Sequence, residues 1–151
     1  MAYDLKDKRV FLSGPMTGLP SYNVTEFALA HSRCKLAGAR TVYDPAQVWL
    51  SEPQSVSERK DHAQCMRECL RELTRPTACR AETYDVLVQL EGWQQSEGAR
   101  CEAVAATALD MDVVPVSEIE VPAELMPIFE GTQGDGKLPE DEPTRNDRDV
   151  E

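Results

Sequence analysis

Short apolar runs alternate with segments of helical periodicity along most of this chain, and this alternation limits the fold more than any other feature. The first two runs, residues 9–13 and 41–43, flank a helical pattern that begins near Asn23. Two further runs, 84–90 and 113–116, flank an alanine-rich helical segment. The order β-α-β-α-β-α-β predicts a three-layer α/β sandwich with a mostly parallel sheet of four or five strands and right-handed crossovers.

Three helices are expected to connect these strands. Asn23 followed by Glu26 has the spacing of a capping box that opens the first helix. The second and third helices are predicted over residues 57–73 and 98–109, where apolar residues recur at helical intervals. The expected strand order is 2-1-3-4, with a fifth strand near residues 118–121.

Other segments are predicted to be less regular. Residues 47–57 are mostly polar and are predicted to be irregular, with Trp49 as their largest apolar group. Residues 74–82 contain a proline that interrupts the helical pattern, so we interpret them as a surface insertion. A short helix is expected within residues 122–129, limited by two prolines. We assign residues 1–130 to one α/β domain. Residues 131–151 form an acidic tail, predicted to be disordered because it has almost no large apolar side chain.

The composition excludes some classes of function. The chain has 151 residues, enough for one domain with a core, and its 16 basic and 27 acidic residues give a formal net charge of −11. Such acidity argues against binding to duplex nucleic acid, because binders of that kind neutralise phosphates with a basic face. A small anion can still be held by backbone N–H groups. No apolar run approaches the roughly 20 residues that a membrane span needs.

The five cysteines, at positions 34, 65, 69, 79 and 101, are odd in number and follow no apolar signal segment. We therefore expect reduced thiols and a cytoplasmic protein. His62, Cys65 and Cys69 could share a helix face and bind a metal. No fourth ligand with the spacing of a metal site is visible, so buried thiols are the favoured interpretation, and no metal is predicted.

The loops after the first and third strands carry the groups best suited to chemistry. Residues 13–18, SGPMTG, form a glycine-bounded loop with two hydroxyls, and residues 91–105, EGWQQSEGARCEAVA, lead into the third helix. In a parallel sheet of this order the two loops meet across one crevice at the switch point. Glu102 is the candidate catalytic residue. Alternatively, it lies in the first helical turn and only offsets the positive end of the helix dipole.

The two loops together resemble those of the nucleoside 2-deoxyribosyltransferase-like proteins, which include uncharacterised phage and bacterial members. The resemblance rests on a strand followed by SGPMTG and LPSYN, and then on GW, S, GA and E before an alanine-rich helix. It covers roughly residues 8–117. It implies a flavodoxin-like fold, a homodimer or larger assembly, no cofactor, and cleavage of the N-glycosidic bond of a (deoxy)nucleoside or its 5′-monophosphate.

The resemblance also implies roles for individual residues. Glu102 would attack C1′ of the sugar, and water or another base would then resolve the glycosyl-enzyme. Ser96 and Gly98 would hold a 5′-phosphate at the start of the helix. The residues implied to bind substrate are Ser13, Gly14, Pro15, Met16, Thr17, Gly18, Trp93, Ser96, Gly98 and Ala99.

One position departs from the pattern of that family. An aspartate is usual in the helix before the third strand, where it orients the nucleophile and the sugar, but this chain has Cys69 at that place. Glu68 is one residue away, and a shift of one residue rotates a helical side chain by about 100°, so it is not a simple substitute. Glu68 and Asp61 are the candidate supporting acids. Asp85 is an alternative to Asp61, although the favoured interpretation is that Asp85 begins its strand.

Two other classes of function stay open at this point. The crevice could bind a nucleotide without catalysis, as a sensor or a sponge for a nucleotide signal, if the supporting acid has been lost. The chain could also be an interaction protein whose acidic tail is the functional part. A pocket-lining carboxylate other than Glu102 would favour the enzyme over the binding module.

Overall fold

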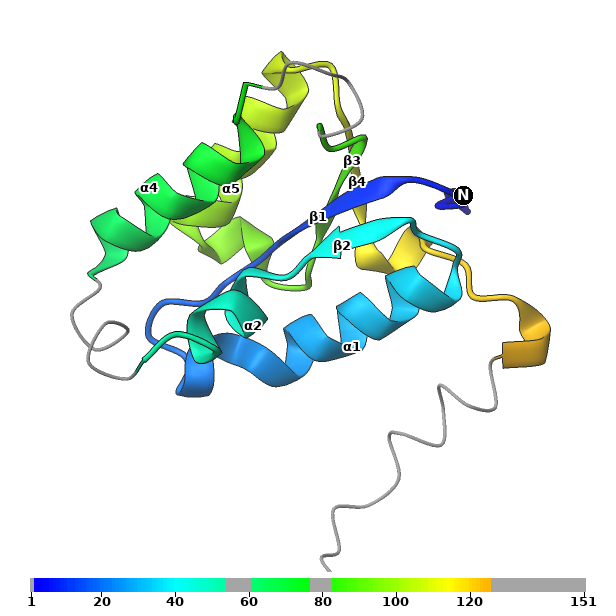
Figure 1. The fold of residues 1–151 in the computed structure, drawn as a ribbon, viewed down its shortest axis with the longest axis horizontal. Coiled ribbons are helices and arrows are strands. Elements are labelled where there is room, and N and C mark those ends of the chain that lie inside the picture. The colour runs from blue at the N-terminus through cyan, green and yellow to red at the C-terminus, as the bar shows by residue number, and fades with distance from the viewer. Residues whose placement is uncertain (1, 54–60, 77–82, 126–151) are drawn as a thin grey trace, which may run out of the picture.

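The computed structural model describes residues 2–53, 61–76 and 83–125, and its sheet is entirely parallel with the order β2-β1-β3-β4 (Figure 1). The strands are β1 (Arg9–Ser13), β2 (Thr41–Tyr43), β3 (Val86–Gln89) and β4 (Asp112–Pro115). The α-helices are α1 (Val24–Leu36), α2 (Pro45–Leu50), α4 (His62–Leu73) and α5 (Glu97–Ala108). Short 3-10 helices are η1 (Pro20–Asn23), η3 (Trp93–Gln95), η4 (Val116–Glu118) and η5 (Ala123–Leu125).

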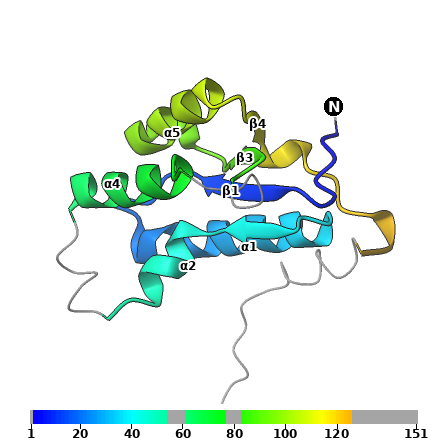
Figure 2. The ribbon, with the colours of Figure 1, turned by 45° about the horizontal axis from the view of Figure 1, so that its top comes forward.

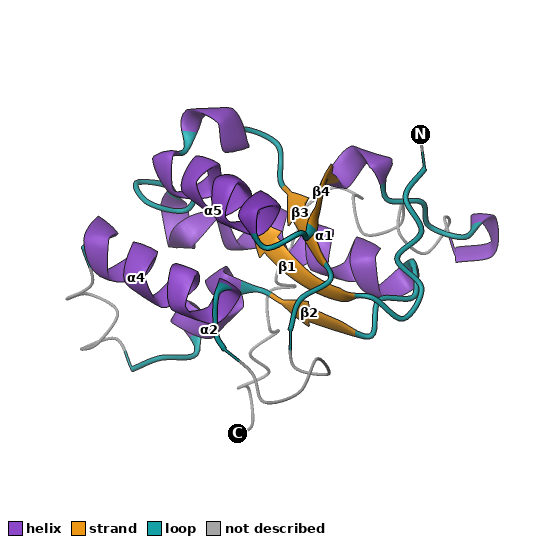
Figure 3. Ribbon diagram, turned by 90° about the horizontal axis from the view of Figure 1, so that it is seen from above, coloured by secondary structure: helices purple, strands orange, loops and turns teal. Residues whose placement is uncertain are grey.

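The helices form two layers, one on each face of the sheet. Figure 2 shows α4 and α5 above the strands and α1 and α2 below them. In Figure 3, which views the molecule from above, α4 and α5 lie side by side. A parallel sheet needs helices on both faces because its strands are apolar on both sides. The predicted α/β fold is therefore confirmed, and its architecture is flavodoxin-like.

The two central strands make the core. Residues 10–12 of β1 and residues 86–88 of β3 have no exposed surface. Phe27 reaches them from α1 on one side and Ala106 from α5 on the other, and both are fully buried. Burying each large apolar side chain contributes roughly 1.5–3 kcal/mol. The carboxyl ends of β1 and β3, where the candidate loops start, thus follow directly on fully buried strand residues.

The bounds of most elements agree with the sequence patterns. β1 and β2 begin and end where predicted, β3 is shorter than its prediction by one or two residues at each end, and β4 and α5 are each displaced by one residue. The strand order 2-1-3-4 is also as predicted.

The prediction that residues 47–57 are irregular is wrong at its start, because α2 occupies part of that segment. Asp44 caps α2, since its Oδ1 accepts from the backbone N–H of Gln47 at 3.1 Å. Pro45 takes the first helical position, where its missing N–H and fixed φ cost nothing. Trp49 is buried on the inner face of this short helix.

The expected capping box of α1 is not formed. Asn23 is left-handed, with φ 61°, and its side chain does not cap the helix. Its Nδ2 instead donates to the carbonyl oxygen of Pro15 at 3.1 Å, so this residue braces the first loop. Residues 57–60 of the second predicted helix lie outside the described part of the chain. α4 begins at His62, because Asp61 is extended and its Oδ1 accepts from Gln64 N at 2.8 Å.

The fifth strand predicted near residues 118–121 is absent from the described residues, where Ile119 makes only one isolated parallel bridge with Tyr3. Of the helix predicted within 122–129, the described residues contain η5, and residues 126–129 lie outside the described part of the chain. Residues 77–82 of the predicted insertion and the predicted tail at 131–151 lie outside the described part of the chain. Within that part, no helix combines the length and the apolarity of a membrane span.

Candidate functional site at the carboxyl edge of the sheet

The carboxyl ends of β1 and β3 are neighbours, and both candidate loops begin there. Ser13 pairs with Gln89 in the parallel ladder, and the backbone N–H of Leu90 donates to the carbonyl oxygen of Ser13 at 2.8 Å. A Cβ at Gly14 would lie 2.7 Å from Leu90 Cβ, so only glycine allows this approach. The two loops therefore meet, as the strand order predicts.

The second loop then folds back toward the first. Gly92 has a left-handed backbone, with φ 83°, and a Cβ there would lie 3.7 Å from the Pro15 ring. Trp93 follows as the first residue of η3 and is half-buried. Gly92 thus provides the turn that brings the GW segment over the SGPMTG segment.

The start of α5 closes one side of the site. Ser96 caps the helix, since its Oγ accepts from the backbone N–H of Ala99 at 3.2 Å. A Cβ at Gly98 would meet Met66 Sδ at 2.7 Å, so glycine lets the second turn of α4 pack against the first turn of α5. Two predicted site residues therefore have clear structural roles in positioning α5.

The remaining predicted loop residues divide into buried and exposed groups. Met16 and Ala99 are buried among core residues, whereas Thr17 and Gly18 are exposed at the tip of the first loop. Thr17 Oγ1 lies 3.2 Å from Nδ1 of His62, which connects the first loop to the start of α4. Polar groups offered to a ligand by this loop are consequently those of Ser13 and Thr17.

Glu102 is the buried charged group of the site. It is the sixth residue of α5 and only 6% exposed. The acidic residue in the first turn of α5 is Glu97, so the interpretation that Glu102 is a first-turn residue offsetting the dipole is wrong. Its carboxyl group faces inward, where a structural role would require hydrogen-bond partners.

Those partners are missing from the described residues. Glu102 Oε2 is enclosed by protein and makes no hydrogen bond, and the same is true of the Oγ of Ser13, which is 1% exposed. Burial raises the pKa of Glu102 to about 8, and the nearby Ser13 hydroxyl opposes this increase, although the pair does not reach hydrogen-bonding geometry. At neutral pH the carboxyl is therefore mostly protonated.

Helix α4 covers this face of the sheet with Cys65, Cys69 and Leu73, all buried. The position at which the resembling family usually has an aspartate is thus occupied by the buried thiol of Cys69. Glu68 is half-exposed and its Oε1 accepts from Gln64 Nε2 at 3.1 Å. The described residues contain no group of three or more histidine, cysteine or carboxylate side chains arranged to hold a metal ion.

The candidate supporting acids are engaged elsewhere. Asp61 is the N-cap of α4. Asp85 forms an ion pair with Arg9 at 3.0 Å and accepts from the Arg9 backbone N–H, and these contacts hold the pKa of Asp85 below its ordinary value. Asp85 precedes β3 and therefore lies at the amino edge of the sheet, away from Ser13, as expected for a residue that begins its strand.

Sequence reasoning missed Tyr43 and His62. Tyr43 is the last residue of β2, and its ring stacks on Phe11 with centroids 5.0 Å apart. Its place directly before Asp44-Pro45, at the carboxyl end of a predicted strand, was the available signal. His62 could not be placed from the sequence, because its contact with Thr17 depends on how α4 crosses α5.

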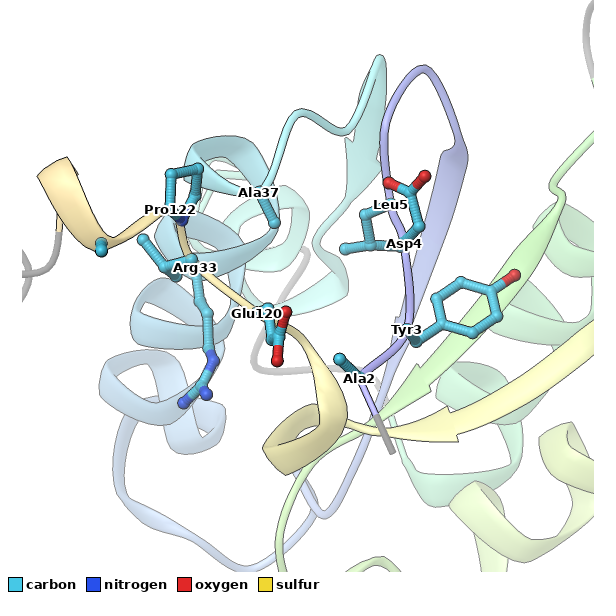
Figure 4. A pocket seen from close by; sticks show the side chains of 10 residues that line it. Ala2, Tyr3, Asp4, Leu5, Arg33, Ala37, Glu120 and Pro122 are labelled. Carbon is cyan, nitrogen blue, oxygen red and sulfur yellow. The ribbon is translucent and has the colours of Figure 1, made fainter.

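A separate pocket of about 810 Å³ lies near the amino edge of the sheet, between the chain before β1, the end of α1 and residues 120–123. Figure 4 shows Arg33 and Glu120 on one side of it and Tyr3 and Asp4 on the other. Arg33 Nε donates to the carbonyl oxygen of Ile119 at 2.9 Å, which ties this wall together. None of the residues predicted to bind substrate lines this pocket.

The fold and the meeting of the two loops define a flavodoxin-like α/β domain with a candidate site at the switch point of its sheet. Residues 8–115 match the profile of a protein family described as a domain of unknown function, DUF4406, and the chain belongs to that family. The match contains both loops and Glu102. No curated protein and no solved structure matches the chain.

Proposed function

We propose that this protein cleaves the N-glycosidic bond of a (deoxy)nucleoside or nucleoside 5′-monophosphate, with Glu102 as the nucleophile. The observation that carries the proposal is the pair of enclosed, unpaired polar groups, Glu102 Oε2 and Ser13 Oγ, at the carboxyl edge of a parallel sheet. An unpaired buried polar group costs about 1–3 kcal/mol, so such a pair is retained where a ligand supplies the missing hydrogen bonds. The hydroxyls of a sugar can both donate and accept.

The chemistry suits a buried carboxyl group. An ionised Glu102 oxygen forms a bond to C1′ while the C1′–N bond breaks, and the base leaves with the electron pair and takes up a proton. Water or a second base then attacks C1′ and restores the carboxylate. Positive charge that develops on the sugar attracts the carboxylate more strongly in this enclosed site than in water.

The start of α5 is the proposed place of a 5′-phosphate. Gly98 and its neighbours offer backbone N–H groups at the positive end of a twelve-residue helix. The Ser96 hydroxyl accepts from Ala99 N but keeps its own hydrogen to donate. Thr17 and His62 lie close to this turn and would complete the contact.

A second candidate function is nucleotide binding without catalysis. Two observations favour it: a buried thiol, Cys69, stands where the resembling family has an aspartate, and the pKa of Glu102 is about 8, which leaves few ionised carboxylates at neutral pH. A protein of this kind would bind a nucleotide tightly and release no base.

We also propose that the protein acts as a homodimer in the cytoplasm. A nearly apolar groove of about 560 Å³ runs along the outer side of α5 and is lined by Leu70, Cys101 and Val104, of which Val104 is 72% exposed. Glu97 and Arg100 both border this groove, so two copies related by a two-fold axis could offer opposite charges to each other. The cysteines of the described residues are free thiols, which suits a reducing compartment.

A panel of nucleosides and 5′-monophosphates, ribo and deoxy, tests the proposed function. The purified protein is incubated with each compound and free base is separated and quantified, with Glu102→Gln as the matched control. Release of base by the wild type alone supports the enzyme. Binding by calorimetry without any base release supports the non-catalytic alternative.

A further inference from the structure

Tyr43 lies on the same face of the sheet as Ser13. Phe11 and Tyr43 are partners in the parallel register, and their rings stack at 5.0 Å with an interplanar angle of 21°. Alternate residues of a strand point to the same face, so Phe11 and Ser13 share a face with Tyr43. This is the face covered by α4 and α5, from which Glu102 approaches.

The Tyr43 phenol lies near several acidic side chains of that face. Burial raises the pKa of Tyr43 above its ordinary value of 10.0, and the neighbouring Cys69 and Glu72 raise it further. Glu102 and Glu68 act in the same direction, which places both carboxyl groups within electrostatic reach of the phenol. Tyr43 therefore keeps its proton across the neutral and alkaline range, and its O–H is available as a donor.

That donor is unused by the described part of the chain, where the Tyr43 hydroxyl makes no hydrogen bond. The neighbouring Tyr84 provides the contrast: its ring lies 6.1 Å from that of Tyr43, and its hydroxyl donates to Glu72 Oε1 at 2.6 Å. Both phenols also contact Phe11, Tyr43 by stacking and Tyr84 through an edge contact at 5.4 Å. The two residues share an environment and differ in whether the hydroxyl has a partner.

We propose that the Tyr43 hydroxyl donates a hydrogen bond to the sugar of the bound nucleoside and thereby orients the sugar toward Glu102. This inference rests on the proposed function and adds a residue to it. A donor is needed on this side because the buried α4 side chains that cover this face are Cys65, Cys69 and Leu73, and none of them is a strong hydrogen-bonding group. The role is orientation of C1′ toward the carboxylate, so it is expressed more in kcat than in KM.

Tyr43→Phe and Tyr84→Phe are matched variants, because each removes one hydroxyl and keeps a ring against Phe11. We expect Tyr43→Phe to lower kcat for base release about tenfold or more with KM within threefold and an unchanged unfolding midpoint. Tyr84→Phe, which loses its bond to Glu72, should be less stable and keep kcat within twofold. A kcat of Tyr43→Phe within twofold of the wild type, or equal losses of kcat in both variants, would overturn the inference.

The wild-type assay separates failure of this inference from failure of the proposed function. If the wild type releases no base, the enzyme proposal fails, and the same two variants are compared by calorimetric titration with 2-deoxyribose 5-phosphate and with the monophosphate that the wild type binds. The inference then predicts that Tyr43→Phe weakens both affinities about threefold and that Tyr84→Phe leaves them unchanged. Affinities of Tyr43→Phe equal to those of the wild type, or absence of any sugar phosphate binding, would overturn it.

Discussion

The Oγ of Ser13 and the Oε2 of Glu102 are enclosed in the same region of the protein, and neither has a hydrogen-bond partner among the described residues. Ser13 ends β1 and Glu102 lies in the second turn of α5, so two elements far apart in sequence bring these groups together. Two buried polar atoms without hydrogen bonds destabilise the folded state, as expected where a ligand supplies the missing hydrogen bonds.

The first prediction concerns the pH dependence of base release. Only the ionised carboxyl can attack C1′, and the pKa of Glu102 is about 8. kcat/KM, which reports the free enzyme, should therefore rise about tenfold per pH unit below pH 8 and level off above it. Initial rates at low substrate concentration between pH 5.5 and 9.5 measure this. A profile that is already flat at pH 6 would show that the nucleophile is a carboxyl with an ordinary pKa.

The second prediction concerns stability. A carboxyl whose pKa rises from 4.5 unfolded to about 8 folded favours the protonated native state. The contribution of this carboxyl to the free energy of unfolding is fully present below pH 4.5. It is lost as the pH rises to about 8, by at most about 1.4 kcal/mol per pH unit. Glu102→Gln cannot ionise, so its free energy of unfolding should exceed that of the wild type by a margin that grows between pH 5 and pH 8. Urea unfolding at both pH values tests this, and a constant difference contradicts a raised pKa.

The fold could be predicted because its signals are local. The apolar run at β1 and the glycines of the first loop specify a buried strand and a tight turn, and the order of the elements then determines which strand ends meet. Asn23 shows where such reasoning fails, because an asparagine suited to capping a helix instead donates to Pro15 once the loop folds back.

The candidate site could be predicted only in outline. The spacing between Ser96 and Glu102 indicates their positions on α5. No local pattern reports that Glu102 Oε2 lacks a hydrogen-bond partner among the described residues, or that the pKa of Glu102 is raised. Tyr43 was missed for a similar reason, since its environment is created by α4 and α5, which are distant in sequence. Burial and electrostatics of this kind depend on tertiary packing.

The third prediction separates the two roles of Ser96. Ser96→Ala removes the cap of α5 and should lower the free energy of unfolding by about 1 kcal/mol. Ser96→Asp keeps a capping oxygen and should leave the free energy of unfolding unchanged. Relative to the wild type, both variants should lose more affinity for a nucleoside 5′-monophosphate than for the free nucleoside. In Ser96→Asp the added negative charge repels the phosphate. Calorimetric titrations with the two ligands measure the difference. Equal weakening toward both ligands would remove Ser96 from phosphate binding.

The fourth prediction concerns the outer groove of α5. Val104→Arg places a charge in the nearly apolar groove and should convert a homodimer into a monomer of 16.8 kDa in light scattering. Leu109→Arg is the control, because Leu109 is also exposed but does not line the groove. A wild type that is monomeric at micromolar concentration, or a Val104→Arg variant that stays dimeric, contradicts the proposed interface.

The covalent intermediate is the most direct measurement of the central claim. The protein is incubated with a 2-fluoro-substituted nucleoside or its monophosphate, whose glycosyl-enzyme is resolved slowly, and the intact mass and proteolytic peptides are then determined. The account predicts a mass increase of one glycosyl group on the peptide that contains Glu102, with release of an equivalent of base, and no adduct on Glu102→Gln. An adduct on another residue, or base release that continues in Glu102→Gln, would contradict it.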